Sequence, residues 1–289
     1  MTDSKYGLVV VIGYGTVTGN VLKKVAECSS TFDYSVEYIE HEAHMFNTAK
    51  SFAEASGIKV LNLYSKEDVH KHFVSLFGQR TLIISASNNY LFPKDIVSRE
   101  EFTIINFHNA LLPDFPGRNA PTWVIYNKCK TSGITWHYVT EDLDAGDIII
   151  QKSCDINDDI KAYELASKLM ELAYEAFSEC FPDVLCNKAV AFRQTVKKDR
   201  RIYRSSEIPA NGTFDLNDDP EEIYRLLRAT DYGKNDIFPA VSTEIDGKKV
   251  IIKRYKKMLR SEAEEKDNRI FLPLDEEHVL MLKYDVVSE

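Results

Sequence analysis

The sequence lacks the features that mark secreted and membrane-spanning proteins. Its five cysteines form no CxxC pair, and scattered, odd-numbered thiols are typical of a reducing compartment. No apolar run approaches the roughly 20 residues that span a bilayer. The first six residues are too polar to begin a signal peptide. We therefore expect a cytoplasmic protein without a membrane anchor.

An excess of positive charge is also missing. The 289 residues carry a formal net charge of -9, whereas binding along a phosphate backbone needs clustered Lys and Arg that release counterions. Two basic segments stand out, at 197–204 and 248–260. They are compatible with contact to a phosphorylated substrate, but solvated faces of a loop and a hairpin explain them at least as well. Nucleic acid is therefore not the expected partner.

The first half of the chain alternates strand and helix patterns. Gly7–Ile12, Thr81–Ser85 and Thr103–Phe107 are continuous apolar runs of the kind found in buried strands, and Val17–Ala26 has helical spacing. Such alternation builds a parallel sheet covered by helices. The remaining elements expected here are strands at 34–39, 59–63, 134–139 and 147–151 and helices at 49–55 and after Ser65.

The pattern changes in the second half. Lys161–Leu185 predicts one long amphipathic helix, and Pro220–Ala229 a short helix that begins with proline. Asp246-Gly247 between two apolar segments is a hairpin signal. We expect an α/β protein: a Rossmann-like open sheet in a catalytic domain over residues 1–205, and a smaller β-rich, OB-like domain over 206–289.

Polar residues follow one of the buried strands. Asn106 and His108 are two residues apart at the end of Thr103–Phe107, so their side chains leave on the same side. Ligands bind at the carboxyl ends of strands in open parallel sheets. Asp144, in a loop between two apolar strands, can face the same crevice. Each residue alone has an ordinary explanation as a turn former or a locally bonded histidine, but together they favour an active site.

The surrounding residues form a dense set of motifs: N-x-H-x-x-L-L-P from Asn106, the Pro116-Gly117 loop, G-x-T-x-H at Gly133, Thr135 and His137, and D-x-G at Asp144 with I-I-x-Q ending at Gln151. Together these motifs resemble those of a known family, the 10-formyltetrahydrofolate-dependent formyltransferases. The resemblance is dense from Ile104 to Gln151 and extends to the RLLRA segment at 225–229 and the strand-rich tail, which are similar to the C-terminal module of the tRNA and sugar branches.

The resemblance implies a one-carbon transferase that moves a formyl group from 10-formyltetrahydrofolate, its cosubstrate, to a primary amine without a metal. Asn106 would stabilise charge on the formyl oxygen. His108 would take the proton of the attacking amine, and Asp144 would orient His108. Backbone groups of two loops would hold the carrier's pterin, with contacts from Ser87, Asn88, Tyr90, Leu91, Phe92, Val139, Thr140, Glu141 and Leu143.

The acceptor amine is open at this stage. A nucleotide-linked amino sugar is our first expectation, because the chain is acidic and lacks a continuous basic stripe. The initiator methionyl-tRNA and a hydroxylamine-bearing amino acid are alternatives, and a homodimer is compatible with the sequence. Aromatic rings could stack on a sugar or base and arginine could pair with phosphate; the candidates are Gly13, Tyr14, Arg118, Asn119, Trp123 and Tyr232. Core packing is the alternative for Trp123.

Two other classes of function compete. Gly13, Gly15 and Gly19 form a glycine-rich turn after the first strand, and Glu40 follows the second, as in a nucleotide-dependent oxidoreductase. The spacing, however, is G-x-G-x-x-x-G rather than G-x-G-x-x-G. A non-catalytic binding module is the other alternative, although such a module has no need to combine an amide, an imidazole and a carboxylate.

Overall fold

The computed structural model describes residues 4–43, 47–235, 237–264, 266 and 268–287. Its contacts form two compact units. The first contains residues 1–117, 131–154 and 167–202, and the second contains 118–130, 155–166 and 203–289. The chain therefore passes between the units more than once, and the domain division expected at residue 205 stays a prediction.

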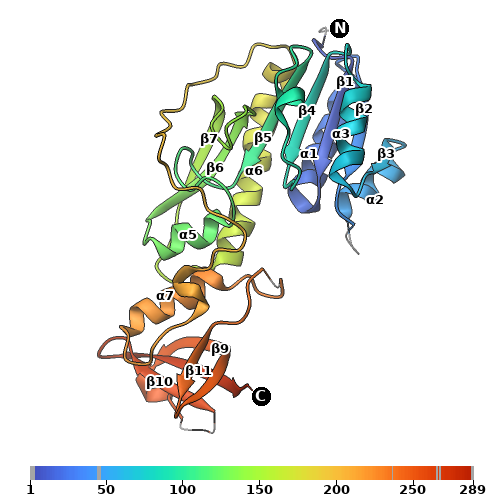
Figure 1. Cartoon of the computed structure of the whole chain (residues 1–289). Helices are drawn as coiled ribbons and strands as arrows, with labels where there is room; N and C mark the ends of the chain where they lie inside the picture. The colour runs from blue at the N-terminus through green and yellow to red at the C-terminus, as the bar shows by residue number, and fades with distance from the viewer. Residues whose placement is uncertain (1–3, 44–46, 236, 265, 267, 288–289) are drawn as a thin grey trace. The chain divides into compact units, whose positions relative to one another are not determined.

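The first unit is built on a seven-stranded sheet with the order β3-β2-β1-β4-β5-β6-β7 (Figure 1). The pairs from β3 across to β5 are parallel, whereas β6 runs antiparallel to β5. The strands are β1 Leu8–Gly13, β2 Ser35–Glu40, β3 Lys59–Asn62, β4 Thr81–Ala86, β5 Phe102–His108, β6 Thr131–Tyr138 and β7 Ile148–Asp155.

Burial explains the composition of the central strands. Every residue of β1 and of β4 is buried, as expected of strands covered on both faces, which read as continuous apolar runs. Helix α6 packs on the sheet through Trp136 of β6, whose ring lies 5.0 Å from that of Phe177. The helices are α1 Gly15–Ser29, α2 Thr48–Ala55, α3 Lys66–Ser75, α4 Lys94–Val97 and α6 Ala162–Leu185.

Local signals set the helix starts. The hydroxyl of Ser65 accepts a hydrogen bond from the backbone N–H of Asp68 at 3.0 Å and so caps α3. Asn47 caps α2 in the same way. Gly13, the last residue of β1, has φ of +145°, and a Cβ there would lie 1.8 Å from the carbonyl oxygen of Ala86. The glycine is therefore needed for the close approach of β1 and β4.

The second unit contains a separate four-stranded antiparallel sheet with the order β10-β11-β9-β8. Asp246 and Gly247 both have positive φ and join β8 to β9, as the hairpin signal predicted. The elements are α5 Ala120–Tyr126, α7 Pro220–Thr230, β8 Ser242–Ile245, β9 Lys248–Leu259, β10 Arg269–Pro273 and β11 His278–Val286, with short 3-10 turns at Pro209–Gly212 and Arg260–Glu262.

An apolar face of α7 packs on this sheet. Ile223 and Leu227 share a buried cluster with Ile252 of β9 and Leu280 of β11. The predicted mixed α/β class, with an open Rossmann-like sheet and a separate β-rich C-terminal sheet, is confirmed. Over the residues described, no helix has the length and apolar character needed to cross a bilayer.

Candidate active site

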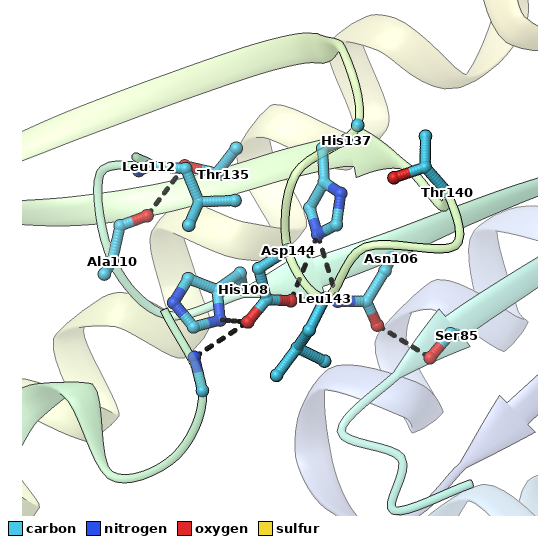
Figure 2. Close-up of polar contacts among 12 residues, drawn as sticks. Ser85, Asn106, His108, Ala110, Leu112, Thr135, His137, Thr140, Leu143 and Asp144 are labelled. Atoms are coloured by element: carbon cyan, nitrogen blue, oxygen red, sulfur yellow. Dashed lines mark hydrogen bonds and ion pairs between the residues drawn. The ribbon is translucent and has the colours of Figure 1, made fainter. Parts of the chain in front are cut away.

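Strands β5 and β6 bring four polar residues to one face of the sheet. Their antiparallel register places Asn106 opposite His137 and His108 opposite Thr135. Residues two apart on a strand share a face, so both pairs project the same way. Figure 2 shows the Asn106 amide, the two imidazoles and the carboxylate of Asp144 pointing toward one another. The three residues that we expected to converge therefore do so, and His137 joins them.

Asp144 lies between the two histidines. Its Oδ2 is 3.7 Å from Nδ1 of His108 and its Oδ1 is 3.6 Å from Nε2 of His137. The backbone N–H of Gly117 donates to Oδ2 at 2.8 Å. Burial raises the pKa of Asp144, but the two histidines and the Gly117 N–H outweigh burial and hold the pKa well below its ordinary value. The carboxylate is therefore ionised at neutral pH.

His108 presents one basic nitrogen to this carboxylate. Its Nε2 lies 2.9 Å from the carbonyl oxygen of Phe115, which can only accept, so Nε2 carries the hydrogen and Nδ1 faces Asp144. Burial lowers the pKa of His108, and the nearby carboxylate of Asp144 opposes that effect only in part. The ring is therefore neutral at pH 7, and a proton taken up at Nδ1 would lie beside a negative charge.

A chain of hydrogen bonds fixes the amide of Asn106. Nδ1 of His137 lies 2.8 Å from the carbonyl oxygen of Tyr138, which can only accept, so Nδ1 carries a hydrogen, and Nε2 accepts from Nδ2 of Asn106 at 3.2 Å. Oγ of Ser85 donates to Oδ1 of Asn106 at 2.7 Å. Asn106 is half-buried. The second hydrogen on Nδ2 has no partner among the described residues, so it can meet a ligand.

Thr135 and Gln151 hold the loop that follows His108. Oγ1 of Thr135 donates to the carbonyl oxygen of Ala110 at 2.7 Å and accepts from the N–H of Leu112 at 3.1 Å. Nε2 of Gln151 donates to the carbonyl oxygen of Leu112 at 2.9 Å and to Oγ1 of Thr135 at 2.8 Å. The threonine and glutamine of the sequence motifs thus act on backbone geometry beside the site.

The first loop expected to hold the folate carrier lies next to Asn106. Nδ2 of Asn88 donates to Oγ of Ser85 at 3.3 Å and to the carbonyl oxygen of Tyr90 at 3.0 Å. The ring of Tyr90 is buried against Phe92, whereas Leu91 is 63% exposed. Ser87 has φ of +53°. Tyr90 and Phe92 therefore serve the core, and the backbone and Leu91 remain for carrier contact, which stays a prediction.

The second expected loop lies against the first. Val139 packs on the same apolar cluster as Tyr90, and Glu141 pairs with Lys94 at 3.0 Å. Oγ1 of Thr140 donates to the carbonyl oxygen of Asp142 at 3.1 Å. Leu143, 37% exposed, directly precedes Asp144. The two loops thus flank the same polar cluster.

Two of the predicted acceptor residues, Gly13 and Tyr14, lie in the first unit at the end of β1. Gly13 is required there by the packing against Ala86. Tyr14 is half-buried at the start of α1. These positions are at the carboxyl end of a parallel strand, where ligands bind, but a role in binding remains a prediction.

The other four predicted acceptor residues lie in the second unit. Trp123 is 4% exposed, with its ring 4.6 Å from that of Tyr203, as the core-packing alternative describes. The hydroxyls of Tyr232 and Thr122 lie 3.0 Å apart. Asn119, with φ of +56°, precedes α5, and the backbone N–H of Arg118 donates to the carbonyl oxygen of Tyr203 at 2.9 Å. Their binding roles stay predictions.

Glu40, the acid of the oxidoreductase alternative, is already engaged. Its Oε1 accepts from Nδ2 of Asn47 at 2.9 Å. Its Oε2 accepts from Nζ of Lys50 and from the hydroxyl of Tyr64, both at 2.8 Å. Both oxygens on which a ribose hydroxyl would depend therefore have protein partners.

Sequence reasoning missed three residues near the cluster: His137, Gln194 and Arg200. His137 stood in a recognised motif without a role, and its place opposite Asn106 depends on the strand register. The side chains of Gln194 and Arg200 donate to carbonyl oxygens of the loop that carries Asp144. The only signal for Arg200 was its position in a basic segment.

The fold and the site together define an α/β protein with a cluster of imidazole, amide and carboxylate groups at the carboxyl end of β5, and comparison with known proteins identifies its family. The family described as formyl transferase matches residues 34–181, which are 148 of the 289 residues. The chain therefore belongs to the formyl transferase family.

Individual relatives divide between two kinds of acceptor. The chain is 29% identical over 186 residues to a methionyl-tRNA formyltransferase of Clostridioides difficile, an alignment that covers 64% of this chain but 57% of that protein. An N-formyltransferase of Helicobacter canadensis, solved in complex with folinic acid and dTDP-3-aminofucose, superposes with a TM-score of 0.72 at 16% identity and covers 97% of this chain and 100% of its own. A 4-N formyltransferase of Francisella tularensis gives a TM-score of 0.66 at 23% identity, with 85% and 96% of the chains covered.

Proposed function

We propose that this enzyme transfers the formyl group of 10-formyltetrahydrofolate to the primary amine of a nucleotide-linked amino sugar. One observation carries the proposal: an amide with a spare hydrogen, a neutral imidazole and an ionised carboxylate meet on one face of the sheet at the carboxyl end of β5. These are the groups that formyl transfer to an amine requires, namely a donor for the developing oxyanion, a base and its orienting acid.

The residues divide the reaction between them. As the amine nitrogen bonds to the formyl carbon, Asn106 donates its second Nδ2 hydrogen to the formyl oxygen, which gains negative charge. Nδ1 of His108 takes the proton that the amine loses. When the bond from the formyl carbon to the carrier nitrogen breaks, His108 returns the proton to that nitrogen. Asp144 stabilises the intervening imidazolium at 3.7 Å.

The surroundings of Asn106 suit the carrier. The loops at 87–92 and 139–143 flank the cluster, and each presents an exposed leucine, Leu91 and Leu143. Asn88 links the first loop to Asn106 through Ser85 by two hydrogen bonds. Binding of the carrier to the first loop would therefore be linked, through Asn88 and Ser85, to the position of the Asn106 amide, and that amide is the proposed donor to the carrier's formyl oxygen.

The choice of acceptor rests on charge and on fold. The chain carries a net charge of -9, which disfavours a tRNA held through many phosphates. The Helicobacter canadensis protein, which covers 97% of this chain, was solved with a nucleotide-linked amino sugar. The sequence relationship to a methionyl-tRNA formyltransferase favours the second candidate, the amino group of an initiator methionyl-tRNA.

A panel of acceptor amines tests the proposal. Purified enzyme is incubated with 10-formyltetrahydrofolate and either dTDP-3-aminofucose, other nucleotide-linked amino sugars, N-hydroxylated amino acids or initiator methionyl-tRNA, and release of tetrahydrofolate is followed. We expect turnover with an amino sugar nucleotide and not with the tRNA. Turnover with the tRNA alone would overturn the acceptor assignment, and no turnover of the carrier with any amine would overturn the reaction.

A further inference from the structure

The backbone of Asp144 is in an unusual conformation. Its φ of +50° lies in the left-handed region, which costs a residue other than glycine about 1 kcal/mol or more. Two residues later, a Cβ at Gly146 would lie 1.8 Å from the carbonyl oxygen of Tyr138. Such a backbone persists only where surrounding groups hold it, and Asp144 is the residue proposed above to stabilise the imidazolium of His108.

The surrounding groups come from a distant segment of the first unit, 192–200. Phe192 and Ile148 exchange two backbone hydrogen bonds of 2.8 Å. Two residues on, Nε2 of Gln194, a residue that is 8% exposed, donates to the carbonyl oxygens of Gly146 at 2.5 Å and Asp144 at 3.3 Å. The segment is therefore anchored on one side of the Asp144 loop.

Arg200 completes the contact from the other end of the segment. Its Nη1 donates to the carbonyl oxygen of Asp144 at 3.2 Å, and its Nη2 donates to the carbonyl oxygen of Leu143. A planar guanidinium with donors in a fixed fork suits two neighbouring acceptors, whereas an ammonium does not. Between them, Gln194 and Arg200 engage the carbonyl oxygens of residues 143, 144 and 146.

We propose that Arg200 and Gln194 are positioning residues for formyl transfer, which hold the backbone of residues 143–146 so that the Asp144 carboxylate stays between His108 and His137. This inference rests on the proposed role of Asp144. Both residues lie beyond the 34–181 segment that the family match covers. The basic segment at 197–204 thus contributes one arginine to the loop that carries Asp144.

The positive charge of Arg200 and its hydrogen bonds to the loop have opposite expected effects on His108. The charged or titratable groups acting on His108 are Asp144, His137 and Arg200. Arg200 lowers the pKa of His108, whereas Asp144 raises it. A loss of positive charge and a displacement of Asp144 would therefore move the His108 titration in opposite directions. A variant that keeps the positive charge at position 200 but loses the paired donors of the guanidinium separates these two effects.

Steady-state kinetics of Arg200→Ala supply the first test, with 10-formyltetrahydrofolate and the amine found fastest in the acceptor panel. We expect kcat to fall about 10- to 100-fold, as for a misplaced reacting group, with little change in either KM. Millimolar guanidinium chloride should restore part of kcat, and equal sodium chloride should not. Lys198→Ala, an exposed neighbour, is the control and should keep its kcat. Unchanged kcat in Arg200→Ala, or an equal loss in Lys198→Ala, would overturn the proposal.

A second test needs no acceptor. In Arg200→Lys the charge is kept, so displacement of Asp144 should lower the pH midpoint at which the labelled His108 ring titrates by NMR, with His108→Gln used for assignment. An unchanged midpoint together with unchanged kcat would contradict positioning. Asp144→Asn separates this inference from the proposed function. Full activity of Asp144→Asn would remove the proposed role of Asp144. Loss of activity in Asp144→Asn together with full activity in Arg200→Ala would remove only the role of Arg200.

Discussion

Two polar clusters lie at the carboxyl ends of strands in the same sheet, and each contains a buried carboxylate. The Glu40 cluster consists of Glu40, Asn47, Lys50 and Tyr64, and the Asp144 cluster of Asn106, His108, His137 and Asp144. In the first, lysine and two neutral donors contact the carboxylate at 2.8 to 2.9 Å. In the second, the nearest side chains are two histidine nitrogens at 3.6 and 3.7 Å.

The difference lies in what the partners can do. Lys50 is permanently charged at neutral pH, so it forms a fixed ion pair, and each oxygen of Glu40 has a side-chain donor. Histidine can gain or lose a proton near neutral pH, so the Asp144 cluster can exchange a proton with a ligand. A buried carboxylate at a ligand-binding edge therefore does not identify a site by itself. Its partners identify it.

Removing the proposed base, His108, should have the largest effect on activity, because the difference between the two clusters lies in a histidine that can exchange a proton. In His108→Gln, no group at the Nδ1 position takes the amine proton, so kcat should fall about 1,000-fold. Formyl transfer is measured by tetrahydrofolate release with the preferred amine. A variant with activity within tenfold of wild type would show that the proton goes elsewhere. Circular dichroism and thermal unfolding check that the fold is kept.

Removing the oxyanion donor should have the next largest effect. Asn106→Ala loses the spare Nδ2 hydrogen and also leaves Nε2 of His137 without its 3.2 Å donor. We expect kcat to fall about 100-fold, with a smaller change in KM. Ser85→Ala is a graded companion, because it frees the amide from its 2.7 Å bond without removing it, and should cost less. Equal losses in both variants would contradict a direct role of the amide.

Sequence patterns predicted the strands well because a strand that is buried on both faces consists of a continuous run of apolar residues. All residues of β1 and β4 are buried, and their apolar runs show this directly. The two-residue spacing also correctly placed Asn106 and His108 on one face. The partner of Asn106 could not be read in this way, because His137 comes opposite it only through the antiparallel register of β5 and β6. Register depends on pairing between segments, which no local pattern records.

The Asp144 loop shows the same limit more strongly. The sequence placed a carboxylate near the crevice, but its two-sided contact with His108 and His137 depends on a left-handed backbone at Asp144. The side-chain donor of Arg200 comes from 56 residues farther along the chain. The run of Lys and Arg around that arginine favoured a solvated or phosphate-binding segment. Only the three-dimensional arrangement shows that it faces two carbonyl oxygens.

The pH dependence of activity should sharpen the comparison further. In the proposed mechanism neutral His108 is the base, and its pKa is lowered from the ordinary value by burial, so kcat/KM should fall with decreasing pH around a midpoint below about 6.5. In Asp144→Asn the carboxylate that raises this pKa is gone, so the midpoint should move to still lower pH while kcat falls about 10- to 100-fold. The amine's own ionisation is common to both enzymes and cancels in the comparison.

A midpoint that moves to higher pH in Asp144→Asn would contradict the assignment of that limb to His108. A midpoint that stays in place would show that the carboxylate does not act on the titrating group.

The stability of the folded protein should also depend on pH through the lowered pKa of His108. The unfolded chain binds a proton at His108 more readily than the folded protein does, so this residue makes stability fall as pH drops below about 6.5. His108→Gln should remove that part of the pH dependence of unfolding.

The smallest effect on activity should come from the Glu40 cluster. Glu40→Gln replaces a buried carboxylate that Lys50 and Tyr64 contact, so the free energy of unfolding at pH 7 should fall by about 1–3 kcal/mol. Burial raises the pKa of Glu40, but Lys50, Asn47 and Tyr64 outweigh burial and lower it. The stability that the carboxylate contributes is therefore present above about pH 4.3 and lost as pH falls below it, so the difference from wild type should shrink in acid.

Urea unfolding at pH 7 and in a series down to pH 3 measures this difference, and kcat should stay within about twofold of wild type. The matched control is Glu179→Gln, since Glu179 pairs with Lys152 at 2.5 Å but is 57% exposed; exposed pairs contribute at most about 1 kcal/mol. A loss of activity in Glu40→Gln comparable to that in Asp144→Asn would erase the distinction between the two clusters, because an acid whose oxygens all have protein donors would then be acting in the reaction.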